Sequence, residues 1–180
     1  LANNIRFNKN FATFNSYETL KNKADFLFSI GGDGTLLNGV TYVRDSDISI
    51  LGINTGRLGF ISSVSAGQID DSITDILKGN YKINERTLLE LSTNKKLFKD
   101  NNFALNEVAV SKKDTSSMIR IDAYVDDEFL NTYWADGLVI STPTGSTGYS
   151  LSCGGPIIMP GTNNIIITPN APHNLNVRPI

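Results

Sequence analysis

Apolar runs alternate with glycine-rich or polar breaks in the first part of the chain. The run at residues 25–30 predicts a buried strand, and the pattern that follows predicts a helix to about residue 44. A second apolar run at 48–53 predicts another strand, and apolar residues at helical spacing over 66–79 predict an amphipathic helix. Strand, helix, strand and helix at this spacing are typical of an α/β unit with a parallel sheet.

After residue 79 the helical periodicity disappears and short apolar runs follow one another. Asp126-Asp127 suits the turn of a hairpin between two of these runs. The predicted strands are 88–91, 103–105, 107–111, 119–125, 129–133, 138–141 and 165–168. We therefore predict an α/β domain with a parallel sheet at residues 1–79, followed by a β-rich domain at residues 80–180.

Composition narrows the class of protein. The chain has 180 residues, a net charge of −2, one cysteine and one histidine. Nearly balanced charge argues against nucleic acid as a partner, and no apolar run is long enough to span a bilayer. One cysteine excludes an internal disulfide and fits a reducing compartment, and the lack of a Cys/His cluster leaves no structural zinc site.

A glycine-rich turn, Gly31-Gly32-Asp33-Gly34-Thr35, joins the first predicted strand to the first predicted helix. This geometry aims several backbone N–H groups at one point, which suits a phosphate. The carboxylate is unexpected there, because a phosphate-binding turn has no use for another negative charge. Asp33 therefore binds a metal, accepts a proton from a hydroxyl group, or only caps the helix.

Three further clusters are rich in polar residues or glycine. Residues 54–60 form a glycine-punctuated loop after the second predicted strand. The pair Asn106-Glu107 interrupts an apolar run, and its alternatives to a site are an edge strand facing water or a structural hydrogen bond. Residues 136–156 alternate hydroxyls and glycines, which suits a polyhydroxyl or phosphate ligand with Tyr149 stacking or hydrogen-bonding; the alternative is a polar surface loop. His173 could touch a phosphate or hold a loop together.

Several well-known motifs are missing from the sequence. There is no Gly-x-x-x-x-Gly-Lys-Ser/Thr, no Gly-x-Gly-x-x-Gly after a strand, and no Gly-x-Ser-x-Gly. The chain is therefore neither a P-loop enzyme nor a hydrolase of the Gly-x-Ser-x-Gly type, and a nucleotide site would be built differently.

Taken in order, these segments resemble the NAD kinase family, which uses ATP or polyphosphate. The matching segments are 31–35, 54–60, 106–107, 136–156 and the tail over 168–179. The glycine–aspartate motif alone also occurs in lipid kinases and phosphofructokinases. The Asn-Glu pair together with Thr144-Gly145-Ser146-Thr147-Gly148-Tyr149 is far more specific.

The resemblance implies an enzyme that transfers the γ-phosphate of ATP to the 2′-hydroxyl of the adenosine ribose of NAD, giving NADP. A divalent metal, Mg²⁺, would bridge the phosphates without an assigned protein ligand, and Asp33 would contact the accepting hydroxyl as base or orienting group. The implied binding residues are Gly32, Gly34, Thr35, Leu58, Phe60, Asn106, Glu107, Asp136, Thr147, Gly148, Tyr149, Ser152 and His173.

Within that set the resemblance implies different roles. Asn106 and Glu107 would bind the adenine or ribose end of NAD, Leu58 and Phe60 would pack around the adenine, and Asp136 would lie on the nicotinamide side. Residues 147–149 and 152 would line the NAD pocket.

The resemblance also implies a cytoplasmic homotetramer or homodimer. It leads us to expect a strand–helix unit before residue 1 and closing β segments after residue 180. The sheet at residues 1–79 would then be an incomplete, Rossmann-like one, and the β-rich domain at residues 80–180 would be sandwich-like. Two alternatives stay open: a lipid kinase of the same superfamily, and a non-catalytic module that binds NAD or an adenine nucleotide.

Overall fold

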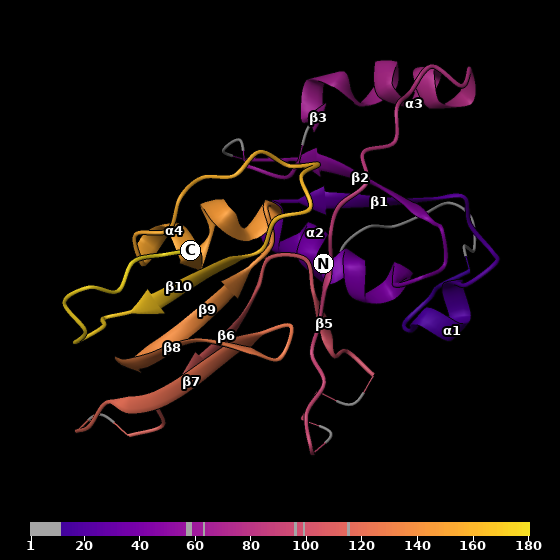
Figure 1. Ribbon diagram of the computed structural model, residues 1–180. Coiled ribbons are helices and arrows are strands. Elements are labelled where there is room, and N and C mark those ends of the chain that lie inside the picture. The colour runs from indigo at the N-terminus through magenta and orange to yellow at the C-terminus, as the bar shows by residue number, and fades with distance from the viewer. Residues whose placement is uncertain (1–11, 57–58, 63, 96, 99, 115) are drawn as a thin grey trace. The chain divides into compact units, whose positions relative to one another are not determined.

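The computed structural model divides into two compact units, residues 1–81 and 82–180 (Figure 1). The structure describes residues 12–56, 59–62, 64–95, 97–98, 100–114 and 116–180.

The first unit is built on a parallel sheet in the order β1-β2-β3. Its elements are α1 (Tyr17–Leu20), β1 (Phe26–Gly31), α2 (Asp33–Val43), β2 (Ser49–Asn54), β3 (Val64–Ser65), the 3₁₀ helix η2 (Ala66–Gln68) and α3 (Ile69–Leu77). β1 and β2 are paired in parallel from Phe26 opposite Ser49 to Gly31 opposite Asn54, so both strands end at the same edge. The predicted parallel sheet is confirmed.

α2 packs its apolar face against β1 and β2 (Figure 1). Its buried residues Leu36, Val40 and Val43 recur every three or four positions, the spacing that puts them on one face. Val43 joins Leu20 and Ile48 in a buried core cluster. This packing fixes the start of α2, and with it Asp33, directly after the end of β1.

The last helix of this unit departs from its predicted pattern. Ile69, Ile73 and Ile76 are half-buried, as an amphipathic helix requires, but Leu77 is 82% exposed. The prediction that Leu77 belongs to the apolar face is therefore wrong. β3 was not predicted, because two residues are too few to show a periodicity.

The second unit is rich in antiparallel strands, which confirms the β-rich character predicted for this part of the chain. One sheet has the order β10-β9-β6, and two pairs are β4-β5 and the hairpin β7-β8. The elements are β4 (Leu89–Glu90), β5 (Phe103–Ala104), β6 (Glu107–Ser111), β7 (Ile119–Val125), β8 (Glu128–Ala135), β9 (Gly137–Ser141), η3 (Thr144–Thr147), α4 (Tyr149–Ser152) and β10 (Ile166–Asn170). Asp126 and Asp127 form the hairpin turn, with φ of 51° and 65°.

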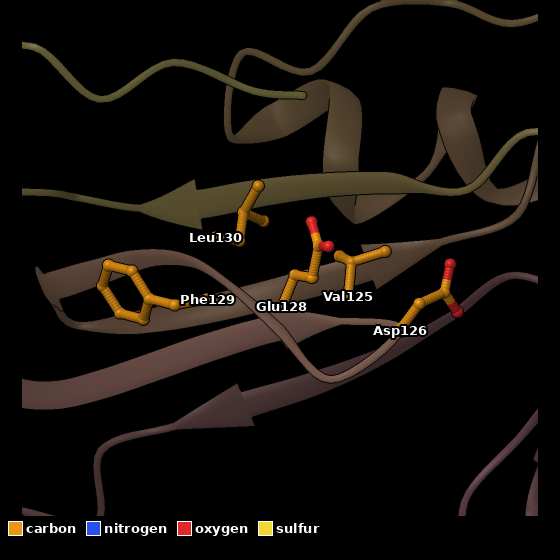
Figure 2. A pocket seen from close by; sticks show the side chains of 5 residues that line it. All are labelled: Val125, Asp126, Glu128, Phe129 and Leu130. Atoms are coloured by element: carbon orange, nitrogen blue, oxygen red, sulfur yellow. The ribbon is translucent and has the colours of Figure 1, made fainter.

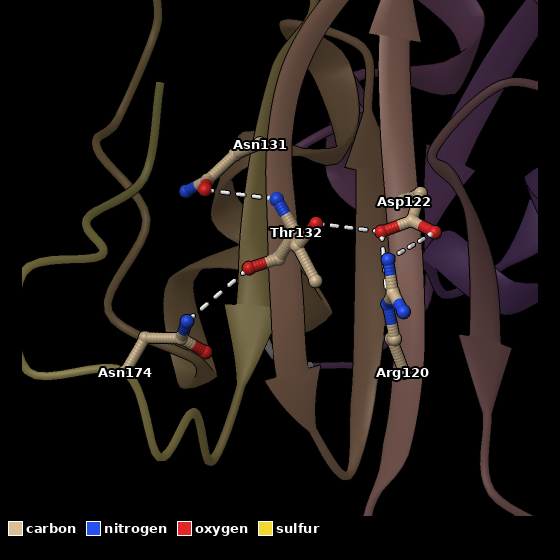
Figure 3. A network of polar contacts seen from close by, with 5 residues as sticks. All are labelled: Arg120, Asp122, Asn131, Thr132 and Asn174. Atoms are coloured by element: carbon tan, nitrogen blue, oxygen red, sulfur yellow. Dashed lines mark hydrogen bonds and ion pairs between the residues drawn. The ribbon is translucent and has the colours of Figure 1, made fainter.

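Side chains bond β8 on both of its edges (Figure 3). The Asn174 amide accepts the Trp134 N–H at 2.8 Å and donates to the Thr132 carbonyl at 3.2 Å, which pins the C-terminal segment along β8. On the other edge the Thr132 hydroxyl donates to Asp122 Oδ1 at 2.6 Å, and Arg120 lies 3.1 Å from the same carboxylate. The Thr132 hydrogen bond holds the pKa of Asp122 below its usual range.

The hydroxyl- and glycine-rich segment after β9 is not a surface loop. It folds into η3 and the short helix α4, and α4 packs against β9 and β10 (Figure 1). Thr142, Ser146 and Ser150 in this segment are fully buried. Among the described residues, no helix is both long and apolar enough to cross a membrane.

Candidate functional site

The Asp33 carboxylate is held by backbone amides from a distant part of the first unit. Its Oδ2 accepts the Phe60 N–H at 2.8 Å, and its Oδ1 accepts the N–H groups of Ile61 and Ser62, each at 3.2 Å. The side chain therefore connects the start of α2 to the segment after β2, which is more than the helix cap that was one alternative. In the described part of the chain Oδ2 accepts one N–H, which leaves it a lone pair for a hydroxyl group.

Gly59 makes room for this arrangement. A Cβ at this position would overlap the Asp33 carboxylate, so only glycine permits the close approach. The neighbouring Phe60 uses its backbone for the contact with Asp33, while its side chain is 76% exposed. Leu58, the other residue predicted to pack around an adenine, lies outside the described residues.

Gly32 and Gly34, which flank Asp33, differ from Gly59 because they have open space around them. A Cβ on either residue would meet no atom of the described residues within 4 Å, so the packing of the fold does not require glycine there. Thr35 is exposed, and its N–H donates to the Gly32 carbonyl at 3.0 Å. The open space beside these backbones suits a ligand that approaches them closely.

Asn106 and Glu107 present two buried acceptors at the start of β6. Asn106 Oδ1 and Glu107 Oε2 are buried, and neither has a hydrogen-bond partner among the described residues. Burial raises the pKa of the Glu107 carboxyl, and a hydrogen bond from the Tyr149 backbone N–H lowers it in part. Because unpartnered buried acceptors cost free energy, both oxygens would be stabilised by a group that donates a hydrogen bond to them.

The earlier alternatives for Asn106-Glu107 hold only in part. β6 is the outer strand of its sheet, as the edge-strand alternative expected, but Glu107 is half-buried. Glu107 Oε2 has no partner among the described residues, so a structural hydrogen bond does not account for this oxygen.

The buried hydroxyls after β9 bind the protein itself. Ser146 Oγ donates to the Pro143 carbonyl at 2.7 Å and accepts the Ile158 N–H at 3.0 Å. Ser150 Oγ lies 2.9 Å from Thr168 Oγ1. These hydroxyls shape the segment, so a ligand would meet its more exposed side chains.

The predicted binding residues of this segment have such side chains. Thr147 is half-buried, Ser152 is exposed, and Tyr149 is exposed and accepts a hydrogen bond from Asn170 Nδ2 at 2.7 Å through its hydroxyl. At Gly148 a Cβ would stand 3.1 Å from Glu107 Oε2, so this residue lies directly against the Asn106-Glu107 pair.

Asp136 and His173 have other surroundings. The Asp136 carboxylate forms an ion pair with Lys112 Nζ at 2.7 Å. His173 is exposed, and its backbone N–H donates to the Trp134 carbonyl at 2.8 Å. In the first unit the structure thus groups Asp33 with Gly32, Gly34, Thr35 and Phe60, and in the second it groups Asn106 and Glu107 with Gly148 and Tyr149. The partners described above for Asp136 and His173 are Lys112 and Trp134, which belong to neither group.

Sequence reasoning overlooked Gly59 and Thr142. Gly59 stood inside the glycine-punctuated loop, but nothing in the loop's pattern distinguishes it from Gly56. Thr142 follows β9, is 0% exposed, and donates its hydroxyl hydrogen to the Leu105 carbonyl at 2.6 Å. Nothing in the sequence around Thr142 predicts this hydrogen bond.

Two hollows lie in the second unit. The larger, of about 400 Å³, is an open groove beside the β7-β8 turn, lined by Val125, Asp126, Glu128, Phe129 and Leu130 (Figure 2). The smaller, of about 200 Å³, is lined by Glu107 together with Leu91, Phe98, Asn101, Asn102, Phe103, Ala104, Val108 and Ala109. Of the predicted site residues, Glu107 forms part of the wall of the smaller hollow.

Among the described residues, no three His, Cys, Asp or Glu side chains gather in a way that would hold a metal ion. Mg²⁺ commonly binds through substrate phosphates and waters and needs few protein ligands.

Two family models match the chain. A model of the ATP-NAD kinase N-terminal domain matches residues 3–81, and a model of the ATP-NAD kinase C-terminal domain matches residues 105–180. The chain belongs to the NAD kinase family.

Named NAD kinases align along almost the whole chain. The NAD kinase of Cytophaga hutchinsonii is 55% identical over 98% of this chain and 60% of its own length, and that of Flavobacterium johnsoniae is 53% identical over 96% of this chain and 59% of its own length. The chain thus spans about 60% of the length of these relatives.

Two solved NAD kinase structures share the fold. A yeast NADH kinase complexed with NADH has a TM-score of 0.80 and 31% identity, covering 92% of this chain and 50% of that one. An NAD kinase from Archaeoglobus fulgidus in complex with ATP has a TM-score of 0.73 and 30% identity, covering 87% of this chain and 60% of that one.

Substituting Gly59 tests how Asp33 is held in this NAD kinase family member. We expect Gly59→Ala to push the carboxylate off its amides and lower the free energy of unfolding by about 1–3 kcal/mol. Amide hydrogen exchange at Phe60, Ile61 and Ser62 should become faster. Gly56→Ala is the matched control, because a Cβ there meets no described atom within 4 Å. Equal exchange in both variants would contradict the role of Gly59.

Substituting Glu107 tests the cost of its unpartnered oxygen. Because burial raises the folded-state pKa of this carboxyl above 4.5, its protonation stabilises the fold below pH 4.5, and that contribution is lost as the pH rises through the raised pKa. Gln carries no ionised oxygen and keeps an acceptor for the Tyr149 N–H. We expect Glu107→Gln to melt at a higher temperature than wild type at pH 7, with the difference vanishing below pH 4.5. A melting-temperature difference that does not change with pH would disprove this cause.

Proposed function

We propose that the full-length protein phosphorylates the 2′-hydroxyl of the adenosine ribose of NAD with ATP, giving NADP. The observation that supports this most strongly is the family match along nearly the whole chain. The relatives are described as NAD kinases, and the two solved neighbours were captured with NADH and with ATP. The lipid-kinase alternative has no comparable support.

Asp33 is the proposed catalytic residue. In the transfer, the 2′-oxygen forms a bond to the γ-phosphorus while the bond from that phosphorus to the bridging oxygen of ADP breaks. The free lone pair of Oδ2 would accept a hydrogen bond from the 2′-hydroxyl, orient it, and take its proton late in the step. The three amides that hold the carboxylate keep this lone pair in one direction, which favours positioning as its main contribution.

Gly32, Gly34 and Thr35 would meet the phosphates of ATP. At the start of α2 the Thr35 N–H donates to the Gly32 carbonyl, whereas the N–H groups of Asp33 and Gly34 come before the first helical hydrogen bond, and the helix dipole favours an anion at this end. The open space at both glycines would let phosphate oxygens come close to the backbone. Mg²⁺ would arrive as part of the MgATP substrate, with its charge balanced by phosphate oxygens.

Asn106 and Glu107 would hold the adenosine end of NAD. Both offer acceptors, so the matching ligand groups are donors, such as ribose hydroxyls or the adenine amino group. The remaining proposed roles follow the family resemblance: Leu58 and Phe60 around the adenine, Asp136 on the nicotinamide side, residues 147–149 and 152 along the pocket, and His173 near a phosphate.

The domain division and assembly also belong to this proposal. The proposed domains are a Rossmann-like domain at 1–79 and a sandwich-like NAD-binding domain at 80–180. The enzyme would be cytoplasmic and form homodimers or homotetramers. The compact units, which divide after residue 81, and the family models, of which one ends at residue 81, support a boundary in this region.

Substituting the aspartate tests the proposed chemistry. We expect Asp33→Asn in the full-length protein to lower kcat for NADP formation about 100-fold or more, because the amide cannot take a proton. Calorimetry should show NAD binding retained. Turnover within about threefold of wild type would overturn the role of Asp33. NAD binding without any turnover in the wild-type protein would instead favour a non-catalytic binding module.

Substituting Gly34 tests whether glycine is required at this position for binding ATP or for the stability of the fold. Ala is the better helix former by about 1 kcal/mol, so Gly34→Ala should leave the melting temperature unchanged or higher. Its methyl group would fill space proposed for a phosphate, and we expect KM for ATP to rise about tenfold or more. Gly67→Ala is the control, since a Cβ there also meets no described atom within 4 Å. An unchanged KM for ATP in Gly34→Ala would refute phosphate binding at this backbone.

A further inference from the structure

Thr142 lies at the centre of a small hydrogen-bond network in the second unit. It follows β9 directly and is 0% exposed. Its hydroxyl donates to the Leu105 carbonyl at 2.6 Å and accepts the Gly145 N–H at 3.1 Å, and its own N–H donates to the Asn106 carbonyl at 2.9 Å. A hydroxyl is the smallest side-chain group that can donate and accept at once.

Two of these bonds, to Leu105 and Asn106, link the two segments that form the candidate NAD-binding group, and the third holds Gly145 to Thr142 within one segment. Leu105 and Asn106 lead into β6, where the two unpartnered acceptors lie. Gly145 belongs to η3, which leads through Gly148 to Tyr149, the residue whose N–H bonds the Glu107 carboxylate. Thr142 therefore holds both sides of this group in one arrangement.

Other contacts also bring the two segments close together: β6 pairs with β9 with Glu107 opposite Ser141, and the Ser141 hydroxyl donates to the Asn106 carbonyl at 3.4 Å. A Cβ at Gly145 would overlap the Asn106 carbonyl, so the backbones touch there. Contact between the backbones fixes how near they come, but not the direction in which the Asn106 and Glu107 side chains point. Directional hydrogen bonds are needed for that, and those of Thr142 end on the residues directly before Glu107.

We propose that Thr142 is a positioning residue for the NAD site: its hydroxyl sets the spacing of Asn106 and Glu107 relative to the segment 145–149, and through it the affinity for NAD. Thr142 itself touches no reacting atom. The inference rests on the proposed function and adds to it a residue that determines affinity for one substrate only.

The test compares Thr142→Val, Thr142→Ser and Thr132→Val with wild type in the full-length protein. Val keeps the shape of threonine and removes the hydroxyl, whereas Ser keeps the hydroxyl. Thr132 is the matched control, because its hydroxyl also donates a 2.6 Å hydrogen bond, to Asp122 on the β7-β8 hairpin (Figure 3). The same chemical change is thus made at two places in one unit.

We expect Thr142→Val to raise Kd and KM for NAD about tenfold, with kcat and KM for ATP within about twofold of wild type. Thr142→Ser and Thr132→Val should stay within about threefold of wild type in all four constants. Amide exchange at Gly145 should become faster in Thr142→Val and stay slow in Thr142→Ser, because only the serine hydroxyl can accept that N–H.

Unchanged NAD affinity in Thr142→Val would overturn the inference, as would an equal loss in Thr132→Val, which would indicate general destabilisation. If Thr142→Val does not fold, Thr142→Cys replaces it under the same criteria, since a thiol hydrogen-bonds weakly. Failure of the proposed function would appear in the wild-type protein, which would neither bind NAD nor form NADP, and the inference would fall with it. A wild-type protein that is active beside an unaffected valine variant would overturn the inference about Thr142 alone.

Discussion

A buried polar atom is stable only when it has a hydrogen-bond partner. In the candidate site some buried polar atoms have such partners within the protein and others do not. The Asp33 carboxylate has three backbone amides as partners, and Thr142 has two carbonyls and an amide. Asn106 Oδ1 and Glu107 Oε2 have no partner within the described residues. Groups with partners are fixed in direction, and groups without partners are the ones that gain most from a ligand.

The second unit therefore contains both hydrogen-bonded side chains that stabilise it and buried acceptors without partners that destabilise it. An unpartnered carboxylate oxygen raises the free energy of the folded state. The raised pKa of Glu107 has the same cause, because burial favours the protonated, uncharged form of the carboxyl. The hydroxyls of Ser146 and Ser150, by contrast, form hydrogen bonds with other groups of the protein. Their bonds stabilise the segment that presents Tyr149 to Glu107, so satisfied groups support the unsatisfied one.

The sequence allowed the elements to be predicted where a periodicity extends over several residues. β1, α2 and β2 have their predicted order, and the parallel pairing follows from short strands joined through a helix. Leu77 shows the limit: it has the spacing of the apolar face but lies at the last turn of α3, where the helix ends before the side chain can be covered.

The partners of the site residues could not be predicted in the same way. Asp33 binds N–H groups that lie 27 to 29 residues along the chain, and every residue but proline has such a group, so no residue type marks them. The hydroxyls after β9 predict either a ligand-binding segment or a surface loop, because a sequence shows that hydroxyls are present but not which way they point. Burial decides that, and it turned Ser146 and Ser150 inward.

Glycine illustrates the same limit most clearly. Gly59 and Gly145 have no room for a Cβ because another part of the protein fills the space, whereas Gly32 and Gly34 have room that no described atom uses. In the sequence all four are simply glycines next to polar or apolar neighbours. The packing of the described residues requires the first kind and does not require the second. A motif rich in glycine therefore becomes evidence for a ligand only after the structure has shown which of its glycines the fold itself could replace.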